Sequence, residues 1–122
     1  MPKTILIADD EPEYVSIIQK RLEPLGFETD EAFCASDVYD KLAKKKFNLL
    51  LLDFSMYDGD GKQVCAHVRQ DWRYYNLPII IVTGNSHLDE DYFKSYGATD
   101  VIYKPLDLQM MIEKINFYLK YV

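Results

Sequence analysis

The stretch LLLLD at residues 49–53 decides the fold, because four consecutive leucines lead directly into an aspartate. A short apolar run without alternation is typical of a strand that is buried on both faces. The stretch IIIV at residues 79–82 repeats this pattern and leads into Thr83 and Gly84. Strands covered on both faces belong to parallel sheets that carry a layer of helices on each side. The two stretches therefore predict two buried strands of an α/β protein.

Three further strands and five helices alternate with these two strands along the chain. The strands are predicted at 5–8, 27–32 and 101–103, and the helices at 12–25, 36–45, 61–72, 88–96 and 108–121. Strict alternation with right-handed crossovers makes all five strands parallel and places helices on both faces of the sheet. The expected fold is a doubly wound α/β sheet in a single domain that spans residues 1–122.

Proline and glycine mark several of the predicted helix ends. Pro12 is expected to open the first helix, whose apolar face runs as far as Leu25, and Gly26 to end it. Gly97 is expected to close the fourth helix. The final helix is expected to reach about Tyr121.

The overall composition excludes several classes of protein. The net charge of −6 leaves no basic footprint for a nucleic-acid backbone, so no direct nucleic-acid binding is expected. No apolar run approaches the roughly 20 residues that cross a bilayer, and the N-terminus does not resemble a signal peptide. A cytoplasmic protein without membrane insertion is therefore expected. The one basic cluster, Lys44-Lys45-Lys46, is interpreted as a solvated helix end, and Cys34 and Cys65 as reduced packing thiols.

Polar and charged side chains follow four of the five predicted strands. Asp9 and Asp10 follow the first strand, Asp53 the third, Thr83 the fourth and Lys104 the fifth. All carboxyl ends of a parallel sheet open onto one edge, where ligands bind. These residues, which are far apart in sequence, are therefore expected to converge on one small site.

The chemistry of this set is that of phosphoryl transfer. Three crowded carboxylates repel each other, and a divalent cation such as Mg²⁺ removes the conflict. Lys104 offers a compact positive charge to a phosphoryl oxygen, and Thr83 offers a hydroxyl. Each feature alone has an ordinary explanation, such as a helix cap for Asp9-Asp10 or a turn for Asp53. Their joint occurrence at separate strand ends favours an aspartate nucleophile with a metal and a lysine.

Over essentially its whole length the chain resembles the receiver domain of two-component response regulators, the CheY-like family. The motifs that carry the resemblance are Asp9-Asp10, Asp53-x-x-Met56, Asp60-Gly61, Thr83-Gly84 and Lys104-Pro105. The resemblance implies a flavodoxin-like, three-layer α/β/α fold with the strand order 2-1-3-4-5. It also implies a phosphorylation-dependent signalling switch that is not an enzyme beyond its own phosphoryl transfer and slow autodephosphorylation.

The resemblance implies a role for each site residue. Asp53 would accept a phosphoryl group from the phosphohistidine of a histidine kinase or phosphotransfer protein, or from a small phosphodonor. Mg²⁺, for which Mn²⁺ could substitute, would be bound directly by Asp10 and Asp53, through water by Asp9, and by the carbonyl of Ser55.

Three further positions complete the implied site. Lys104 would pair with the phosphoryl group, and Thr83 would hydrogen-bond it. Gly84 would leave space beside it. The Lys104–Pro105 bond would be cis.

The chain departs from the family pattern at two places. The family carries an aromatic switch residue three places before the lysine, and here that position is Val101, with the aromatic at Tyr103 instead. Tyr57 stands where the family often has proline. The usual coupling of the threonine to a buried aromatic is therefore not implied in its ordinary form.

The resemblance implies that partners bind the face made by the fourth helix, fifth strand and fifth helix. Five of the ten tyrosines fall in this part of the chain: Tyr92, Tyr96, Tyr103, Tyr118 and Tyr121. We hypothesise that Tyr103 and its neighbours form a contact surface that depends on phosphorylation. The alternative is that several of them pack between helices. A phosphorylation-dependent homodimer is left open.

Three competing functions remain at the level of sequence. A phosphohydrolase of the haloacid dehalogenase type needs a second acid two places after the nucleophile, where this chain has Ser55. A receiver-like module that never takes phosphate would normally lack one of the site residues. A flavodoxin would need a hydroxyl- and glycine-rich phosphate loop after the first strand. The chain could also be free-standing or a fragment of a larger regulator or hybrid kinase.

Overall fold

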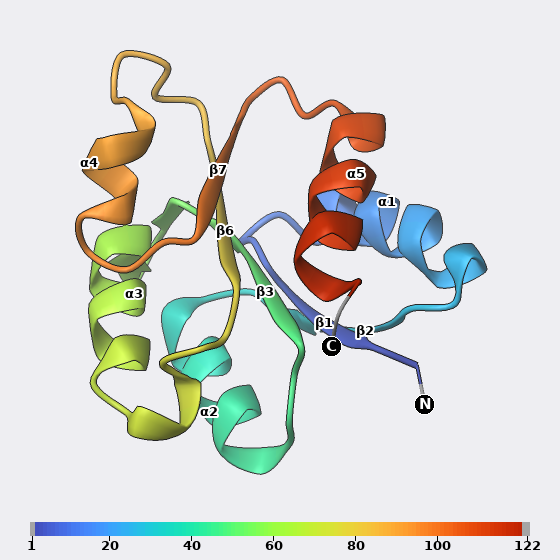
Figure 1. Cartoon of the computed structure of the whole chain (residues 1–122), viewed down its shortest axis with the longest axis horizontal. Coiled ribbons are helices and arrows are strands. Elements are labelled where there is room, and N and C mark those ends of the chain that lie inside the picture. The colour runs from blue at the N-terminus through green and yellow to red at the C-terminus, as the bar shows by residue number, and fades with distance from the viewer. Residues whose placement is uncertain (1, 121–122) are drawn as a thin grey trace.

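A computed structural model describes residues 2–120, which form a five-stranded parallel sheet between two helical layers (Figure 1). The sheet order is β2-β1-β3-β6-β7, and every neighbouring pair is parallel. The strands are β1 (Thr4–Ala8), β2 (Glu28–Ala32), β3 (Leu49–Asp53), β6 (Ile79–Thr83) and β7 (Asp100–Tyr103). Because β6 and β7 are the fourth and fifth strands of this sheet, the order 2-1-3-4-5 is confirmed.

Two helices cover one face of the sheet and three cover the other. The first pair is α1 (Pro12–Leu22) and α5 (Leu108–Leu119), and the second group is α2 (Ala35–Lys44), α3 (Gly61–Arg69) and α4 (Glu90–Lys94). Each layer has its own buried cluster, which joins its helices to the sheet. The predicted doubly wound architecture is confirmed. Within residues 2–120 no helix has both the length and the hydropathy required to span a membrane.

The four leucines of β3 explain why this strand organises the core. Leu50 and Leu52 pack into the cluster under α2, α3 and α4, whereas Leu49 and Leu51 pack into the cluster under α1 and α5. Each of the four side chains is at most 2% exposed. Full burial of a leucine contributes about 1.5–3 kcal/mol, so β3 stabilises both layers at once.

The helix ends differ from the predictions where local geometry intervenes. Helix α1 begins at Pro12 as predicted but ends at Leu22, because Pro24 has no N–H to continue the hydrogen-bond series. A 3₁₀ turn (Glu23–Leu25) follows, and Gly26 closes it with φ 98°. Leu25 is 55% exposed and so lies outside the predicted apolar face.

The third and fourth helices are shorter than predicted. Helix α3 ends at Arg69, and the Asp71 carboxylate starts a separate 3₁₀ turn, η2 (Trp72–Tyr74), by accepting from the Arg73 N–H. Helix α4 has five residues and begins only after Asp89, which caps it by accepting from the Tyr92 N–H. Gly97 takes φ 117° beyond the helix, consistent with its predicted place as a terminator. The predicted end of the last helix at Tyr121 lies outside the described residues.

A short antiparallel hairpin replaces the predicted loop after β3. It consists of β4 (Ser55–Met56) and β5 (Gly59–Asp60). At its turn the Asp58 carboxylate accepts hydrogen bonds from the backbone N–H groups of Ala35 and Ser36, at 2.6 and 3.1 Å. The N-cap residue of α2, Cys34, makes no side-chain cap. The hairpin therefore supplies the cap of α2 from a distant part of the chain.

Gly61 gives a direct test of the packing between the start of α3 and the sheet. A Cβ at this position would lie 3.0 Å from Ile81 Cδ1 and 3.1 Å from Phe54 Cδ1. We expect Gly61→Ala to lower the free energy of unfolding by about 1–3 kcal/mol, because the core would be overpacked. Urea denaturation measures this change. Gly84→Ala is the matched control, since its Cβ would meet nothing within 4 Å. If both substitutions lowered the free energy of unfolding equally, close packing around Gly61 would not be the cause.

Candidate functional site

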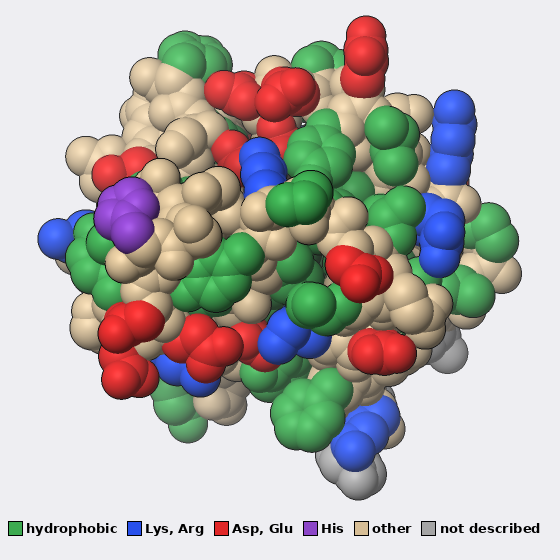
Figure 2. All heavy atoms as spheres, turned by 90° about the horizontal axis from the view of Figure 1, so that it is seen from above, with side chains coloured by type: hydrophobic (Ala, Val, Ile, Leu, Met, Phe, Trp, Pro, Cys, Tyr) green, Lys and Arg blue, Asp and Glu red, His purple; other side chains and the backbone are tan. Residues whose placement is uncertain are grey.

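The predicted site residues gather at the carboxyl edge of the sheet, the edge at which the parallel strands end. Asp9 and Asp10 follow β1, Asp53 and Thr83 end β3 and β6, and Lys104 follows β7. Carboxylate oxygens of Asp9, Asp10 and Asp53 lie within 4.8 Å of one another. Figure 2 views the molecule from this end and shows acidic side chains gathered beside a basic one. The predicted convergence of the three acids is confirmed.

The three carboxylates differ in exposure. Asp9 is 4% exposed and Asp53 is 7% exposed, whereas Asp10 is open to solvent. Burial raises the pKa of Asp9 to about 6; the Glu11 N–H, 2.9 Å away, lowers it in part, and Asp53 and Asp10 raise it further. The acidic cluster therefore stores unfavourable electrostatic energy at neutral pH.

Lys104 balances part of this charge. Its Nζ lies 2.9 Å from Asp53 Oδ1 and forms an ion pair with it. Burial raises the pKa of Asp53, while the lysine hydrogen bond and charge lower it; the net direction is upward. Burial lowers the pKa of Lys104, but its contacts with Asp53 outweigh this, so the lysine stays charged. One positive charge is thus shared by a cluster of three acids.

Thr83 and Gly84 complete the edge beside Asp53. In the sheet Asp53 pairs with Val82, so Thr83 stands one residue beyond the pairing. The Thr83 carbonyl accepts from the Lys104 N–H at 2.7 Å, and its hydroxyl oxygen accepts from the Asn85 N–H at 3.0 Å. A Cβ on Gly84 would meet nothing within 4 Å. Open space therefore lies next to Gly84. The Lys104–Pro105 peptide bond, on the neighbouring strand end, is cis as predicted.

Ser55 lies at the start of the hairpin, two residues after Asp53. Its backbone N–H bonds the Asp53 carboxylate, which opposes the effect of burial on the pKa of that acid. Ser55 pairs with Asp60 across β4 and β5, and the Asp60 carboxylate in turn caps α3 through a capping box with Gln63. The loop that carries Ser55 is therefore held at both ends.

Tyr14 belongs to the site but was missed by the sequence reasoning. Lys104 Nζ lies 5.1 Å from the centre of the Tyr14 ring, within the range of a cation–π contact. The available signal was its position one turn into the helix that follows Asp10. Tyr14 holds the lysine from the α1 side, while Asp53 holds it from β3.

The switch region differs from the arrangement expected of the family. Val101 is 2% exposed and packs in the cluster that contains Phe93. Tyr103, on the same face two residues later, donates its hydroxyl to the Leu88 carbonyl at 2.7 Å. Leu88 lies between Thr83 and α4. The aromatic residue beside Lys104 therefore ties β7 to the segment that begins at Thr83.

The donor set fits a magnesium ion. Three carboxylates and nearby backbone carbonyls are the oxygen ligands that Mg²⁺ prefers, and among the described residues only Lys104 forms an ion pair with the cluster. A divalent cation at this place would relieve the repulsion that Lys104 relieves only in part.

The raised pKa of Asp9 predicts a defined pH dependence. An unfolded aspartate titrates near 3.9, so between about pH 4 and 6 the folded protein binds more protons and stability falls as the pH rises. Without metal, the free energy of unfolding of Asp9→Asn should therefore exceed that of wild type by about 1–3 kcal/mol at pH 7.5. This difference should vanish near pH 4. Urea titrations across this range measure the difference.

The exposed Asp40→Asn provides the matched control and should leave the pH profile of stability unchanged. A profile of Asp9→Asn that is parallel to that of the wild type from pH 4 to pH 7.5 would contradict the assignment.

Known proteins share this architecture. The family model of the response regulator receiver domain matches residues 5–116. A CheY-like response regulator receiver domain protein from Methanospirillum hungatei is 29% identical, with a TM-score of 0.90 over 99% of this chain and 96% of that chain. A two-component response regulator from Clostridium difficile is 26% identical, with a TM-score of 0.85 over 97% and 96%.

A third solved structure contains a bound metal ion. The response regulator protein TrrA from Thermotoga maritima, in complex with Mg²⁺ and BeF, is 27% identical, with a TM-score of 0.85 over 96% of this chain and 99% of that chain. Receiver domains bind Mg²⁺ at an acidic pocket, and the cluster of Asp9, Asp10 and Asp53 has that character.

The family match decides against the haloacid dehalogenase and flavodoxin alternatives. It covers nearly the whole chain, and the sheet order and the acidic edge agree with it. The chain thus belongs to the response regulator receiver domain family, the phosphorylation-dependent switches of two-component signalling.

Proposed function

We propose that Asp53 is the phosphoacceptor of this receiver domain. The observation that carries the proposal is the 2.9 Å contact between Lys104 Nζ and Asp53 Oδ1 inside a cluster of three acids. Asp53 ends a strand that is buried along its whole length, so its position is fixed, and the space beside Gly84 is open. A fixed nucleophile next to an open space and a positive charge suits in-line phosphoryl transfer.

The transfer follows from the charges. A carboxylate oxygen of Asp53 attacks phosphorus while the bond from phosphorus to the donor breaks, and the electron pair of that bond leaves with the donor. With a phosphohistidine donor, the departing imidazole nitrogen keeps the pair. A bound Mg²⁺, or Mn²⁺, would neutralise charge on the phosphoryl oxygens and would be held by Asp10, Asp53 and the Ser55 carbonyl, with Asp9 acting through water.

Lys104 and Thr83 give the modified state its distinct contacts. When Asp53 becomes an acyl phosphate, Lys104 exchanges its carboxylate partner for a phosphoryl oxygen. The Thr83 hydroxyl can donate its hydrogen to the same group, because within residues 2–120 its oxygen is engaged only as an acceptor of the Asn85 N–H. Slow hydrolysis at Asp53 resets the site.

Tyr103 is placed to pass this change on. Its hydroxyl contact with the Leu88 carbonyl joins β7 to the segment after Thr83, and its ring lies 6.4 Å from that of Phe93 in α4. Movement of Thr83 toward the phosphoryl group would therefore alter the face formed by α4, β7 and α5. This contact replaces the coupling that the family builds on the position of Val101.

Partners are proposed on this same face. A histidine kinase or phosphotransfer protein supplies the phosphoryl group in the cytoplasm. A downstream protein then binds the α4–β7–α5 face. A phosphorylation-dependent homodimer would use the same face. Tyr92 is 38% exposed, whereas the Tyr118 hydroxyl is engaged by Asp100 at 2.7 Å. The contact surface therefore includes the exposed Tyr92 together with Tyr103, whose own hydroxyl is held by the Leu88 carbonyl. The single receiver unit serves this role free-standing or within a larger protein.

Chemical phosphorylation tests the assignment of Asp53. Incubation with Mg²⁺ and acetyl phosphate should add one acid-stable, base-labile phosphate, detected as one added phosphate by intact-mass spectrometry. Asp53→Asn should remove the modification, because an amide oxygen is a poor nucleophile. Asp58→Asn, which alters a nearby acid outside the cluster, should still be phosphorylated. Labelling of Asp53→Asn at the wild-type level would place the acceptor elsewhere.

Lys104→Met tests the coupling separately from metal binding. Mg²⁺ binding, measured by calorimetry, should be retained or tightened, because a positive charge beside the acids is lost. Beryllofluoride, a mimic of the phosphate, should shift the amide NMR signals of β7 and α5 in wild type. These shifts should be lost in Lys104→Met, whereas the exposed Lys20→Met should behave as wild type. Full shifts in Lys104→Met would contradict the role of the lysine.

A further inference from the structure

A groove lies at the opposite, amino edge of the sheet, far from the phosphoacceptor. It runs between the end of α2 and the segment from η2 to Pro78 and has a volume of about 800 Å³. A smaller recess of about 80 Å³ between α2 and α3 adjoins it. The two cavities share four lining residues, Leu42, Ala43, Arg73 and Tyr74, so they lie side by side.

The groove is lined by basic residues, whereas the chain as a whole is acidic. The protein has 20 acidic and 14 basic residues, yet the described residues that line the larger cavity include Lys44, Lys45, Lys46 and Arg73 and no carboxylate. Arg73 is paired with Asp71 at 2.7 Å, and Lys45 with Asp30 at 3.3 Å. Lys44 and Lys46 form no ion pair within residues 2–120. The groove therefore presents uncompensated positive charge.

Its floor and rim are apolar and aromatic. Phe47 and Leu77 are buried beneath it, and Tyr74 is half-buried in its wall. Trp72, the only tryptophan of the chain, is 80% exposed at the rim. An exposed tryptophan beside arginine and an apolar floor has the composition of an interaction site.

Hydrogen bonds hold the groove in shape. The Tyr74 hydroxyl donates to the Leu42 carbonyl and so joins η2 to α2. Arg69 donates to the Tyr74 and Tyr75 carbonyls at 2.6 and 3.3 Å, and to the Gly97 carbonyl at 3.0 Å. Because its walls are fixed before a ligand arrives, little conformational entropy is lost on binding.

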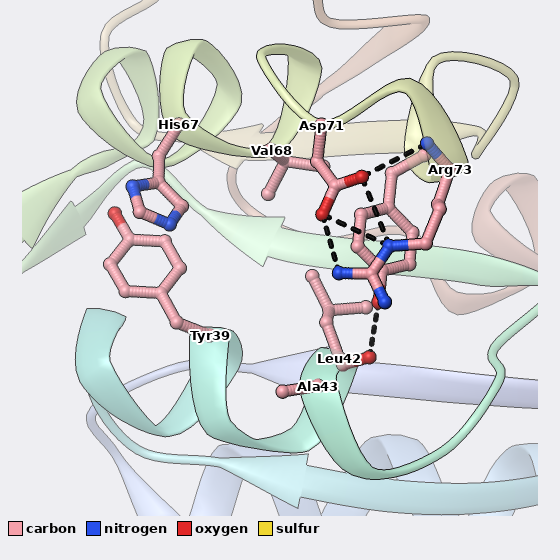
Figure 3. Close-up of a pocket in the computed structure, with 8 residues that line it drawn as sticks. Tyr39, Leu42, Ala43, His67, Val68, Asp71 and Arg73 are labelled. Carbon is pink, nitrogen blue, oxygen red and sulfur yellow. Dashed lines mark hydrogen bonds and ion pairs between the residues drawn. The ribbon is translucent and has the colours of Figure 1, made fainter.

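Figure 3 shows the side chains that line the smaller recess. The rings of Tyr39 and His67 stack at 3.9 Å between α2 and α3, and the Asp71 carboxylate holds the Arg73 guanidinium on the other side. Leu42 and Ala43 lie between these two pairs of side chains. The recess is therefore lined by apolar side chains flanked by polar ones.

We propose that this groove is a docking site for an acidic peptide segment of a partner protein. Carboxylates of the segment would face Lys44 and Lys46, and a bulky apolar side chain would lie against Trp72 and the floor. A flat membrane surface would not reach the floor of a concave groove. A nucleic-acid backbone would need a longer basic surface than Lys44 and Lys46 provide, because Lys45 and Arg73 are already paired with carboxylates.

The docking site is independent of the phosphoacceptor site. The residues that line the groove and those of the acidic cluster do not overlap, and they lie at opposite ends of the strands. A partner could therefore remain bound at the amino edge while Asp53 gains and loses its phosphoryl group.

A peptide selection tests the proposal. A random library of 12-residue peptides is selected against the whole chain, and enriched peptides are titrated while the fluorescence of Trp72 is followed. We expect the enriched peptides to be acidic with a bulky apolar residue and to shift Trp72 emission to the blue. The double variant Lys44→Glu, Lys46→Glu should weaken binding by about tenfold or more, because attraction becomes repulsion.

The matched control reverses two exposed charges in the last turn of another helix, Lys20→Glu and Arg21→Glu in α1. It should leave peptide affinity within about twofold of wild type. Where the Lys44, Lys46 double variant does not fold by circular dichroism, the pair Lys44→Gln, Lys46→Gln replaces it and should still weaken binding.

Two results would overturn the proposal. The first is a set of enriched peptides that lacks acidic residues or binds the groove variant as tightly as wild type. The second is tighter, Lys44- and Lys46-dependent binding of a single-stranded DNA 12-mer or of phosphatidylglycerol vesicles than of any enriched peptide.

Discussion

The repulsion among Asp9, Asp10 and Asp53 is the constraint on which the rest of the structure depends. Three carboxylates with oxygens within 4.8 Å of one another would separate or protonate if their positions were not fixed. Their strands fix them, because the leucines of β3 are locked between two buried clusters. Lys104 neutralises one charge, and the remainder favours a divalent cation. The stability of the core is thus used to hold an unfavourable site.

The same arrangement explains how a small chemical change can have a wider effect. Lys104 is held by Asp53, by the Tyr14 ring and, through its backbone, by the Thr83 carbonyl. A phosphoryl group on Asp53 would change the partners of Lys104 and Thr83 together. Both lie next to Tyr103, whose hydroxyl ties β7 to the segment before α4. A switch requires such a two-state element whose equilibrium the modification can shift.

The sequence predicted those features that follow from rules of chain geometry. A run such as residues 49–53 is typical of a strand buried on both faces, and parallel strands end on one edge, which brings Asp53 and Lys104 together. Features that depend on contacts between distant segments were missed. The Asp58 cap of α2 and the Tyr14 ring over Lys104 depend on tertiary placement, which no local pattern of residues encodes. The later start of α4 had a local signal, the N-cap Asp89, which was overlooked.

The central claim is that three acids bind a magnesium ion opposite Lys104, so that Asp53 can carry a phosphoryl group. A crystal structure of the protein with Mg²⁺ and beryllofluoride measures this most directly. The account predicts beryllium bonded to an Asp53 carboxylate oxygen, Mg²⁺ beside it on Asp10 and the Ser55 carbonyl, and Lys104 Nζ in contact with fluoride. Metal bound away from this cluster, or beryllofluoride absent from Asp53 at saturating concentration, would contradict it.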